Sequence, residues 1–300
     1  MRLVPKLMLL ALAAAAAGWW LTRPAPLPAS AVAGLVGDAA HGEQVFWAAG
    51  CASCHMAPGA KGDAQLVLSG GQRFASPFGT FIAPNISQHP QAGIGTWSLL
   101  DLANALTRGV SPQGEHLYPV LPYAAYGKMQ MQDVADLFAF LKTLPADPTP
   151  SAAHEIGFPF NIRASLGGWK LLFLSTDWAL PGPLSPQADR GRYLVEAMAH
   201  CGECHTPRNA LGGLETSRWL AGTPDPSDAS GKARVPDITP TRLTWTEDEI
   251  ASYLTTGFTP EYDSVGGHMA HVVENFARLP AEDAAAVAAY LKAVPPSGGP

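Results

Sequence analysis

The chain has 300 residues, of which 47% are hydrophobic and 15% are charged, with 30 Gly, 28 Pro and a formal net charge of −6. These counts exclude an intrinsically disordered chain and leave enough apolar material for two domains. A net negative charge supplies no basic surplus for a phosphate backbone, which argues against nucleic-acid binding. Partners are therefore expected to be proteins or a membrane.

The N-terminal residues 1–25 are expected to form a signal or a membrane anchor. Arg2 and Lys6 give a basic start, and residues 7–21 form an uncharged apolar run that contains two tryptophans. The run is shorter than the roughly 20 residues of a full span, but a snorkelling Lys6 would lengthen it. A basic start predicts that the rest of the chain is exported. Cleavage as a signal is the alternative to the uncleaved anchor that we expect.

All four cysteines of the chain occur in two copies of a CxxCH motif. The copies are Cys51, Cys54 and His55, and Cys201, Cys204 and His205. In a helical turn the two thiols of such a motif can reach the two vinyl groups of one haem, and the histidine then lies under the iron. The motif therefore predicts covalent haem c, with the histidine as the proximal axial ligand.

A zinc site made by the two cysteine pairs is the alternative to haem. Paired CxxC motifs of zinc sites usually lie about 15–20 residues apart, whereas a whole domain separates these two. A zinc tetrathiolate also leaves the histidine after each pair unexplained. We therefore predict two haem c groups, one on each motif, and no cysteine remains for a structural disulfide.

Superposing the two motifs reveals an internal repeat that extends well beyond the cysteines. The matched segments are 42–46 with 191–195, 84–87 with 236–239, 96–98 with 244–246, and 133–142 with 283–292. We expect capped helices to start at Ser98 and Thr246. They should end near Gly109 and Gly257, because glycine is common just past the end of a helix.

The repeat predicts two homologous helical domains, at residues 35–147 and 185–296, joined by a connector at 148–184. No part of either domain alternates like a strand, so the expected fold class is all-α. The most apolar part of the connector is 167–174, which is too short to span a bilayer. We expect it to pack as a strap between the domains, and a second membrane or partner contact is the alternative.

An electron-transfer haem needs a second axial ligand, and a methionine thioether is the usual one because it favours reduced iron and raises the potential. Met269 follows a Gly-Gly pair in the loop ahead of the last helix, where such a ligand is expected. We predict that Met269 ligates the second iron. A core packing role for Met269, and ligation by His268 or His271, are the alternatives.

The corresponding loop of the first repeat, residues 118–123, has Leu121 at the ligand position. Leucine cannot bind iron, so we predict that the first haem differs electronically from the second and is either five-coordinate or bound by a displaced ligand. Met129 is a candidate substitute, with packing ahead of the final helix as its alternative. Met131 and His116 are further candidates.

Distinctive residues recur in the segments 83–86, 93–98, 116–119, 191–196 and 201–209. In these segments the chain resembles the multihaem cytochrome c subunits of bacterial membrane-bound alcohol, aldehyde and gluconate dehydrogenases, and related two-haem cytochromes. The resemblance covers nearly everything after residue 40. The best-known members carry three haem motifs, whereas this chain has two.

This resemblance implies two tandem class I cytochrome c-like domains, each wrapped around one covalent haem c. It implies electron transfer from a periplasmic or membrane-bound dehydrogenase subunit to a quinone, an oxidase or a soluble cytochrome of the respiratory chain. The expected location is the periplasmic side of the bacterial inner membrane. A dihaem peroxidase, or another haem enzyme with one open iron site, is the alternative function.

Further residues are expected around each haem. In small c-type cytochromes a loop proline carbonyl accepts a hydrogen bond from the axial histidine, and Pro84 and Pro236 resemble that proline. Such a bond fixes the imidazole ring. Trp97 and Trp245 are expected either at the haem edges or in the core, and Arg73 is a candidate partner for a haem propionate.

Overall fold

The computed structural model describes residues 3–225, 228 and 232–296, so Arg2 of the predicted basic start lies outside the described residues. These residues form mostly helices. The helices are α1 (Leu3–Thr22), α2 (Ala39–Ala48), α3 (Cys51–His55), α4 (Leu99–Arg108), α5 (Tyr123–Tyr126), α6 (Met131–Leu141), α7 (Ser165–Phe173), α8 (Pro186–Tyr193), α9 (Gly202–His205), α10 (Glu247–Thr256), α11 (Met269–Phe276) and α12 (Ala281–Ala293). Short 3-10 turns lie at Ala29–Ala31, Gly62–Leu66 and Thr216–Arg218, and a π-helical turn at Leu194–Met198 extends α8.

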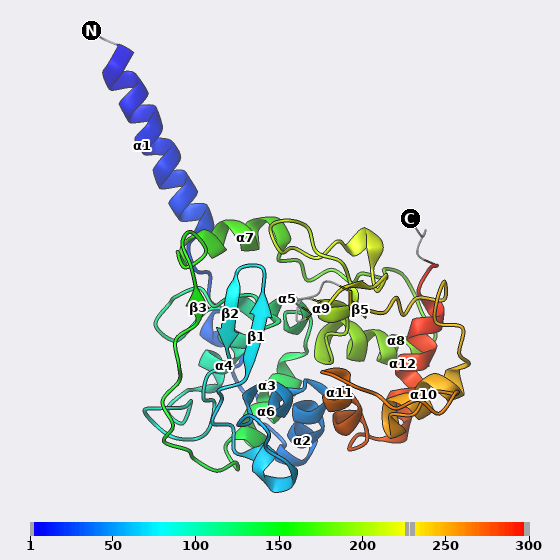
Figure 1. Ribbon diagram of the computed structural model, residues 1–300. Coiled ribbons are helices and arrows are strands. Elements are labelled where there is room, and N and C mark those ends of the chain that lie inside the picture. Colours follow the sequence, from blue (N-terminus) through cyan, green and yellow to red (C-terminus); the bar gives the residue numbers. More distant parts are fainter. Residues whose placement is uncertain (1–2, 226–227, 229–231, 297–300) are drawn as a thin grey trace.

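Helix α1 projects from the body of the molecule as a single rod (Figure 1). It covers the predicted apolar run, and no residue of its segment Val4–Thr22 is buried inside the molecule. Within the described part of the chain it is the one helix long and apolar enough to cross a membrane.

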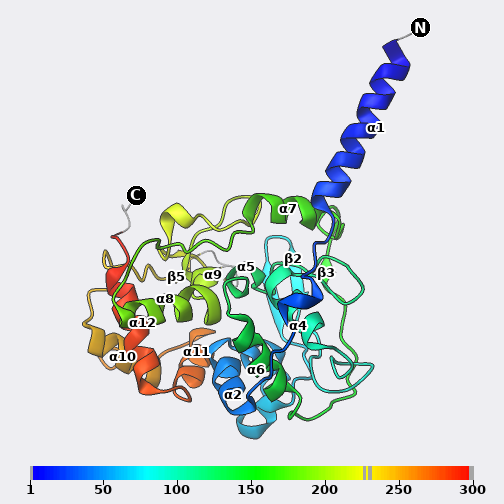
Figure 2. The same cartoon turned by 180° about the vertical axis from the view of Figure 1, so that it is seen from behind.

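A pair of crossed helices forms the centre of each repeat. In the first repeat α2 packs on α6, and in the second α8 packs on α12 (Figure 2). A Cβ at Gly42 would lie 1.9 Å from the carbonyl oxygen of Asp136, and a Cβ at Gly191 would lie 1.9 Å from that of Ala286. Both helix pairs therefore cross at backbone contact, which only glycine permits at these two positions.

The predicted helix boundaries in the matched segments are confirmed. Ser98 and Thr246 each cap a helix with a full capping box. The Ser98 or Thr246 side chain accepts from the backbone amide of Asp101 or Glu249, whose carboxylate in turn accepts from the amide of the capping residue. Helices α4 and α10 end at glycines in the left-handed conformation, Gly109 and Gly257. The two repeats thus place their third helix by the same local signals.

The expectation that neither repeat holds a strand is wrong in detail. Strands β1 (Arg73–Ser76) and β2 (Gly79–Ile82) form an antiparallel hairpin, and β3 (Glu155–Ile156) of the connector joins it as a third strand. A two-residue pair, β4 (Thr223–Pro224) with β5 (Arg234–Val235), lies in the second repeat. Strands of two to four residues are too short for an alternating pattern to be recognised, and the molecule remains mostly helical.

The connector packs against both repeats, as expected of a strap. The Lys170 ammonium on α7 donates to the carbonyls of Arg108 and Gly109 in the first repeat, both at 2.7 Å. The Trp169 indole donates to the Leu211 carbonyl of the second repeat at 3.0 Å. Helix α7 therefore bridges the two halves, and it does so at the end of the molecule from which α1 projects (Figure 1).

Candidate haem sites

Helix α3 holds the first CxxCH motif in one helical turn. Gly50 precedes it in the left-handed conformation, with φ 66°, and turns the chain from α2 into α3. His55 Nδ1 lies 2.8 Å from the carbonyl oxygen of Pro84. A carbonyl can only accept, so Nδ1 carries the proton and Nε2 keeps a free lone pair. His55 is thus held in the tautomer that an axial ligand requires.

Helix α9, with Cys201 as its N-cap residue, holds the second motif with the same bonds. His205 Nδ1 donates to the Pro236 carbonyl at 2.9 Å, which leaves its Nε2 free in the same way. The His205 carbonyl accepts from the Gly222 amide at 2.7 Å, and the His55 carbonyl accepts from the Gly70 amide at 2.7 Å. The expected hydrogen bond from histidine to loop proline is therefore present in both repeats.

The donor groups of both motifs fit haem c. Burial lowers the pKa of His55 and His205, with the proline carbonyls opposing it, so the imidazoles are neutral and able to bind a metal. Burial raises the pKa of Cys51 and Cys201 to about 12, which keeps these thiols protonated. Each motif presents two thiols and one imidazole nitrogen on one helical turn, the set that attaches one haem and binds its iron.

The geometry does not favour the zinc alternative. A tetrathiolate needs four sulfurs converging on one point. Among the described residues, the one group of three or more His, Cys, Asp or Glu side chains whose ligand atoms converge is His41, Asp133 and Asp136, which contains no cysteine.

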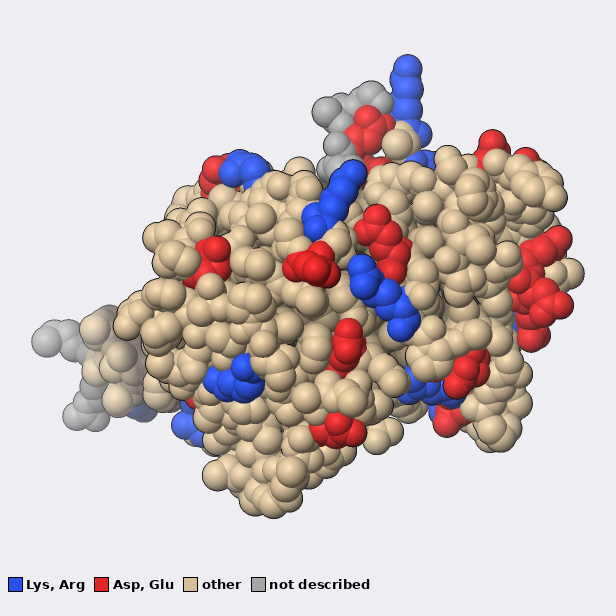
Figure 3. All heavy atoms as spheres, turned by 90° about the horizontal axis from the view of Figure 1, so that it is seen from below, with Lys and Arg blue, Asp and Glu red and all other residues tan. Residues whose placement is uncertain are grey.

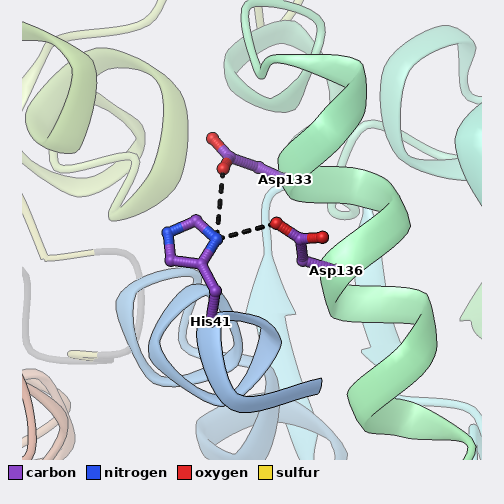
Figure 4. Close-up of side chains that lie close together, drawn as sticks. All are labelled: His41, Asp133 and Asp136. Carbon is purple, nitrogen blue, oxygen red and sulfur yellow. Dashed lines mark hydrogen bonds and ion pairs between the residues drawn. The ribbon is translucent and has the colours of Figure 1, made fainter. Parts of the chain in front are cut away.

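That acidic cluster lies between α2 and α6, and the sequence did not single it out (Figure 4). Asp136 accepts from the His41 ring and the Asp38 amide, each at 2.8 Å. Asp133 accepts from the hydroxyl of Tyr193, which comes from α8 of the other repeat. Since these carboxylates already have protein donors, we interpret the cluster as a structural junction between the repeats.

The two motif helices lie close together across the boundary between the repeats. Burial and then the nearby Cys204 raise the pKa of Cys54 to about 11. Tyr126 contacts a residue just ahead of each motif. Its hydroxyl donates to the Ala49 carbonyl at 2.7 Å, and its ring packs edge-on against that of His200 with 5.5 Å between the ring centroids. Ala49 precedes α3 and His200 precedes Cys201, so one side chain touches both attachment sites.

A second contact joins the first motif to the methionine-bearing helix of the second repeat. Asn275 of α11 donates to the hydroxyl of Ser53, inside the first motif, at 3.0 Å. Arg278, just beyond α11, lies 4.2 Å over the Trp47 ring and donates to Gln65 at 3.2 Å. Helix α11 therefore packs on the first repeat while carrying the candidate ligand of the second.

Backbone hydrogen bonds establish which residues correspond in the two ligand loops. The Leu117 amide donates to the Gly109 carbonyl at 2.8 Å, and the Val265 amide donates to the Gly257 carbonyl at 2.8 Å. Leu121 and Met269 each come four residues later. Met269 is the first residue of α11 and packs, partly buried, against the core. Leu121 thus occupies the position that Met269 holds in the second repeat.

The other candidate ligands of the first iron have different surroundings. Met129 is 5% exposed in the core, one turn before α6, where Leu279 stands before α12. Met131 begins α6 and packs partly buried against the same core. The Nε2 atom of His116 lies 2.8 Å from the Thr22 carbonyl at the end of α1. The surroundings of Met129 favour packing, and those of His116 favour a contact with α1.

The remaining predicted residues have ordinary protein partners. Trp97 and Trp245 both pack partly buried against the core, and the Trp245 ring lies 5.3 Å from that of Tyr253. Arg73 on β1 is exposed and pairs with Glu155 of β3 at 2.5 Å. His268 is exposed, and His271 lies 3.4 Å from Glu274. The two tryptophans thus pack against the core, and Arg73 has a partner within the connector.

Comparison with known proteins identifies the family. The cytochrome c family matches residues 39–145. A "Diheme cytochrome c-type" protein of Cereibacter sphaeroides is 55% identical over 286 residues, which are 95% of this chain and 96% of the relative.

Two further relatives are longer than this chain. The "Fructose dehydrogenase cytochrome subunit" of Gluconobacter japonicus is 36% identical over 90% of this chain and 54% of its own length. The "Gluconate 2-dehydrogenase cytochrome c subunit" of Pantoea cypripedii is 30% identical over 84% of this chain and 58% of its own length. The chain spans about half the length of these dehydrogenase subunits. Together with the two CxxCH helices, the comparisons show that the chain belongs to the dihaem c-type cytochromes, carries two haem c groups and serves in electron transfer.

Proposed function

We propose that the chain is a relay of two haem domains, residues 35–147 and 185–296, within a dehydrogenase complex. Electrons enter from a periplasmic or membrane-bound dehydrogenase subunit and leave to a quinone, an oxidase or a soluble cytochrome. The support for the donor is the likeness to the cytochrome subunits of fructose, gluconate and alcohol dehydrogenases. Helix α1 anchors the relay on the periplasmic side of the inner membrane, for which its length and apolar surface are the support.

In this proposal the chain's own residues attach, orient and tune each haem. The attaching residues are Cys51 and Cys54 in the first domain and Cys201 and Cys204 in the second. His55 and His205 are the proximal iron ligands, held in one tautomer by Pro84 and Pro236. Met269 is the distal ligand of the second iron. Haem supplies the one-electron chemistry when bound, and the protein sets its potential through ligand and burial.

One observation supports the relay above all: the same contacts reach the two attachment sites from both sides of a single boundary. Tyr126 contacts the residues just ahead of both motifs, and Asn275 joins the second repeat to Ser53 inside the first motif. Haems attached at these two sites would exchange electrons within one molecule, without a collision between molecules.

Reduction with less than one electron per protein tests the relay. The purified dihaem protein is mixed rapidly with a limiting one-electron donor, and the absorbance of the two haems is followed. We expect electrons to redistribute between the haems at a rate independent of protein concentration. A redistribution rate that rises in proportion to protein concentration would show exchange between molecules and would overturn the proposal.

A peroxidase with one open iron is the second candidate, because Leu121 occupies the position of a ligand in the first repeat. The reduced protein should then consume hydrogen peroxide catalytically and bind carbon monoxide at one haem. Binding of carbon monoxide without peroxide turnover would leave electron transfer as the function. Rapid peroxide turnover abolished by Leu121→Met would favour the enzyme.

A further inference from the structure

Near its C-terminal end, helix α7 turns a lysine inward and two leucines outward, the opposite of a water-facing helix, whereas Leu166 near its start is buried. Lys170, its one cation, points inward, where its ammonium donates to the last carbonyls of α4 and lies 4.8 Å over the Tyr123 ring. Leu171 and Leu172 point outward and are 62% and 68% exposed. A surface helix in water normally buries its leucines and exposes its lysine. The outer face of α7 is therefore suited to an apolar environment.

The exposed leucines belong to a larger apolar surface at the same end of the molecule. Its members lie in the segment before α7, on α7 itself, and in the loop that accepts a hydrogen bond from Trp169. They are Phe158, Phe160, Ile162, Leu171, Leu172 and Leu211. We call this set the α7 face. The nearest cation in the preceding segment, Arg163, is also turned inward and donates to the His116 carbonyl at 3.0 Å.

The α7 face lies at the foot of α1. A Cβ on Gly167 would lie 1.8 Å from the carbonyl oxygen of Thr22, so α7 crosses the last turn of α1 at backbone contact. His116 binds the same carbonyl from the first repeat at 2.8 Å. Both ribbon views show α7 running across the foot of α1, along the edge of the body from which α1 leaves (Figures 1 and 2). The foot of α1 is thus fixed to the body.

The length of α1 determines the depth of this contact. The 19 residues from Val4 to Thr22 span about 28 Å as a helix, which matches the roughly 30 Å hydrocarbon core of a bilayer. Trp19 and Trp20 are exposed in its last turn, with Arg23 at 5.0 Å over the Trp20 ring, as in an interfacial aromatic belt. If α1 crosses the membrane, Thr22 lies at the membrane surface, and α7 lies there with it.

The opposite face of the molecule has a different character. Seen from below, it carries Lys, Arg, Asp and Glu side chains of both signs scattered over its surface (Figure 3). Such a mixed charged surface is typical of contact with water. The scattered charges of that face contrast with the exposed apolar side chains of the α7 face beside the anchor.

We propose that the α7 face lies in the outer interface of the lipid bilayer as a second, monotopic membrane contact. This inference rests on the proposed anchoring by α1. An interfacial helix buries its apolar side about 5–10 Å into the boundary between headgroups and acyl chains, and Leu171 and Leu172 are placed to do so. Because α7 bonds to both repeats, this contact fixes how both haem sites are oriented relative to the membrane. With α1 as the single membrane contact, the whole molecule would be free to tilt and rotate together with that helix.

Photolabelling from within the bilayer tests this contact in the full chain. The dihaem protein is reconstituted in vesicles of phosphatidylcholine and phosphatidylglycerol that contain a phospholipid with a diazirine on its acyl chain. After illumination, labelled peptides are identified by mass spectrometry. We expect adducts on α1 and on residues 157–173. We expect none around Val36, which is 83% exposed and whose carbonyl binds Gln132 on α6, away from α1.

Matched variants make the result specific. Leu171→Glu combined with Leu172→Glu should lose the adducts on α7 while keeping those on α1 and the full haem content. Val36→Glu, a control at an equally exposed apolar residue, should leave the pattern unchanged. Adducts on α1 with α7 as unlabelled as the Val36 segment would overturn the second contact alone and point to a protein partner for the α7 face. No adducts on either helix would overturn the anchoring as well, while the redistribution of electrons between the haems would still be measurable.

Discussion

The two repeats share their helical frame but differ in the loop between the third and last helices, which carries the candidate iron ligand of the second repeat. Each has a glycine at its helix crossing, a capped third helix and a histidine bonded to a loop proline. Between the third and last helices, the first repeat has the four-residue α5, whereas the second has the eight-residue α11 beginning at Met269. In the proposed function, the frame attaches the haem, and the loop outside the frame supplies or withholds the second protein ligand of the iron.

The two loops also differ in how far other parts of the chain cover them. In the first repeat the connector covers the loop: Tyr118 donates to the Phe160 carbonyl at 3.2 Å, and Arg163 donates to that of His116. The equivalent loop of the second repeat leaves Phe258 and Tyr262 exposed. In one copy of the frame the connector thus covers the loop, while the other keeps an open loop around its candidate methionine ligand.

Disrupting the helix crossing should have the largest effect, and an equal one in both repeats. Gly42→Ala and Gly191→Ala each place a methyl group within 2 Å of a helix carbonyl, so the helices must separate. Overpacking on this scale costs about 3 kcal/mol, which outweighs the roughly 1 kcal/mol that alanine adds to helix propensity. Chemical denaturation of the dihaem protein measures the loss.

Gly266→Ala is the control for this pair, because nothing lies within 4 Å of a Cβ there. Its free energy of unfolding should stay within about 0.5 kcal/mol of the wild type, as for most surface substitutions. If either Gly42→Ala or Gly191→Ala were as well tolerated as the control, the two crossings would not be equivalent.

Exchanging the residues at the ligand position should convert one repeat toward the other. Met269→Leu removes the proposed thioether ligand, so the midpoint potential of the second haem should fall by on the order of 0.1 V, within the roughly 0.8 V range that axial ligands span. The same variant should gain a carbon monoxide site. Spectroelectrochemical titration and carbon monoxide difference spectra measure both changes.

Leu121→Met is the reciprocal variant. It should close the first iron to carbon monoxide and bring its spectrum toward that of the second. If Met269→Leu leaves the spectrum unchanged, Met269 is not the ligand. If the wild type already shows two equivalent low-spin haems that exclude carbon monoxide, the difference between the two irons is absent.

Met129 offers a smaller test of how the first iron is ligated. Because it is buried where Leu279 stands in the second repeat, Met129→Leu should cost less than about 1.5 kcal/mol, as volume-conserving core substitutions do. Its haem spectrum should not change. Loss of a low-spin signal in Met129→Leu, with Met131→Leu unaffected, would instead identify Met129 as the displaced ligand.

Local signals in the sequence were sufficient for the frame. The CxxCH spacing, the caps at Ser98 and Thr246 and the glycines that end α4 and α10 each act within one or two turns, so the pattern alone predicts them. The duplicated pattern also identified Leu121 as the equivalent of Met269. The β1–β2 hairpin was not predicted, because its strands are short and the third strand of its sheet comes from the connector.

Contacts between the repeats could not be predicted, because they have no counterpart within a repeat. Tyr126 and His200 come from different repeats, as do Ser53 and Asn275, and each pair is far apart in the sequence. Neither pair carries a motif. The junction of His41 and Asp133 with Tyr193 was not predicted for the same reason.

The smallest expected effect concerns one of these contacts, the hydrogen bond from Asn275 to Ser53, which lies at the boundary between the two attachment sites. A double-mutant cycle with Ser53→Ala and Asn275→Ala should give a coupling of about 1 kcal/mol in the free energy of unfolding, the usual net value of one hydrogen bond. If this bond only stabilises the boundary, the rate of electron redistribution between the haems in Asn275→Ala stays at the wild-type value. If it holds the two sites at their working separation, that rate falls while both midpoint potentials stay unchanged. A coupling near zero would show that the two side chains do not form this bond in solution, and the approach of α11 to α3 would then depend on the contact of Arg278 with Trp47.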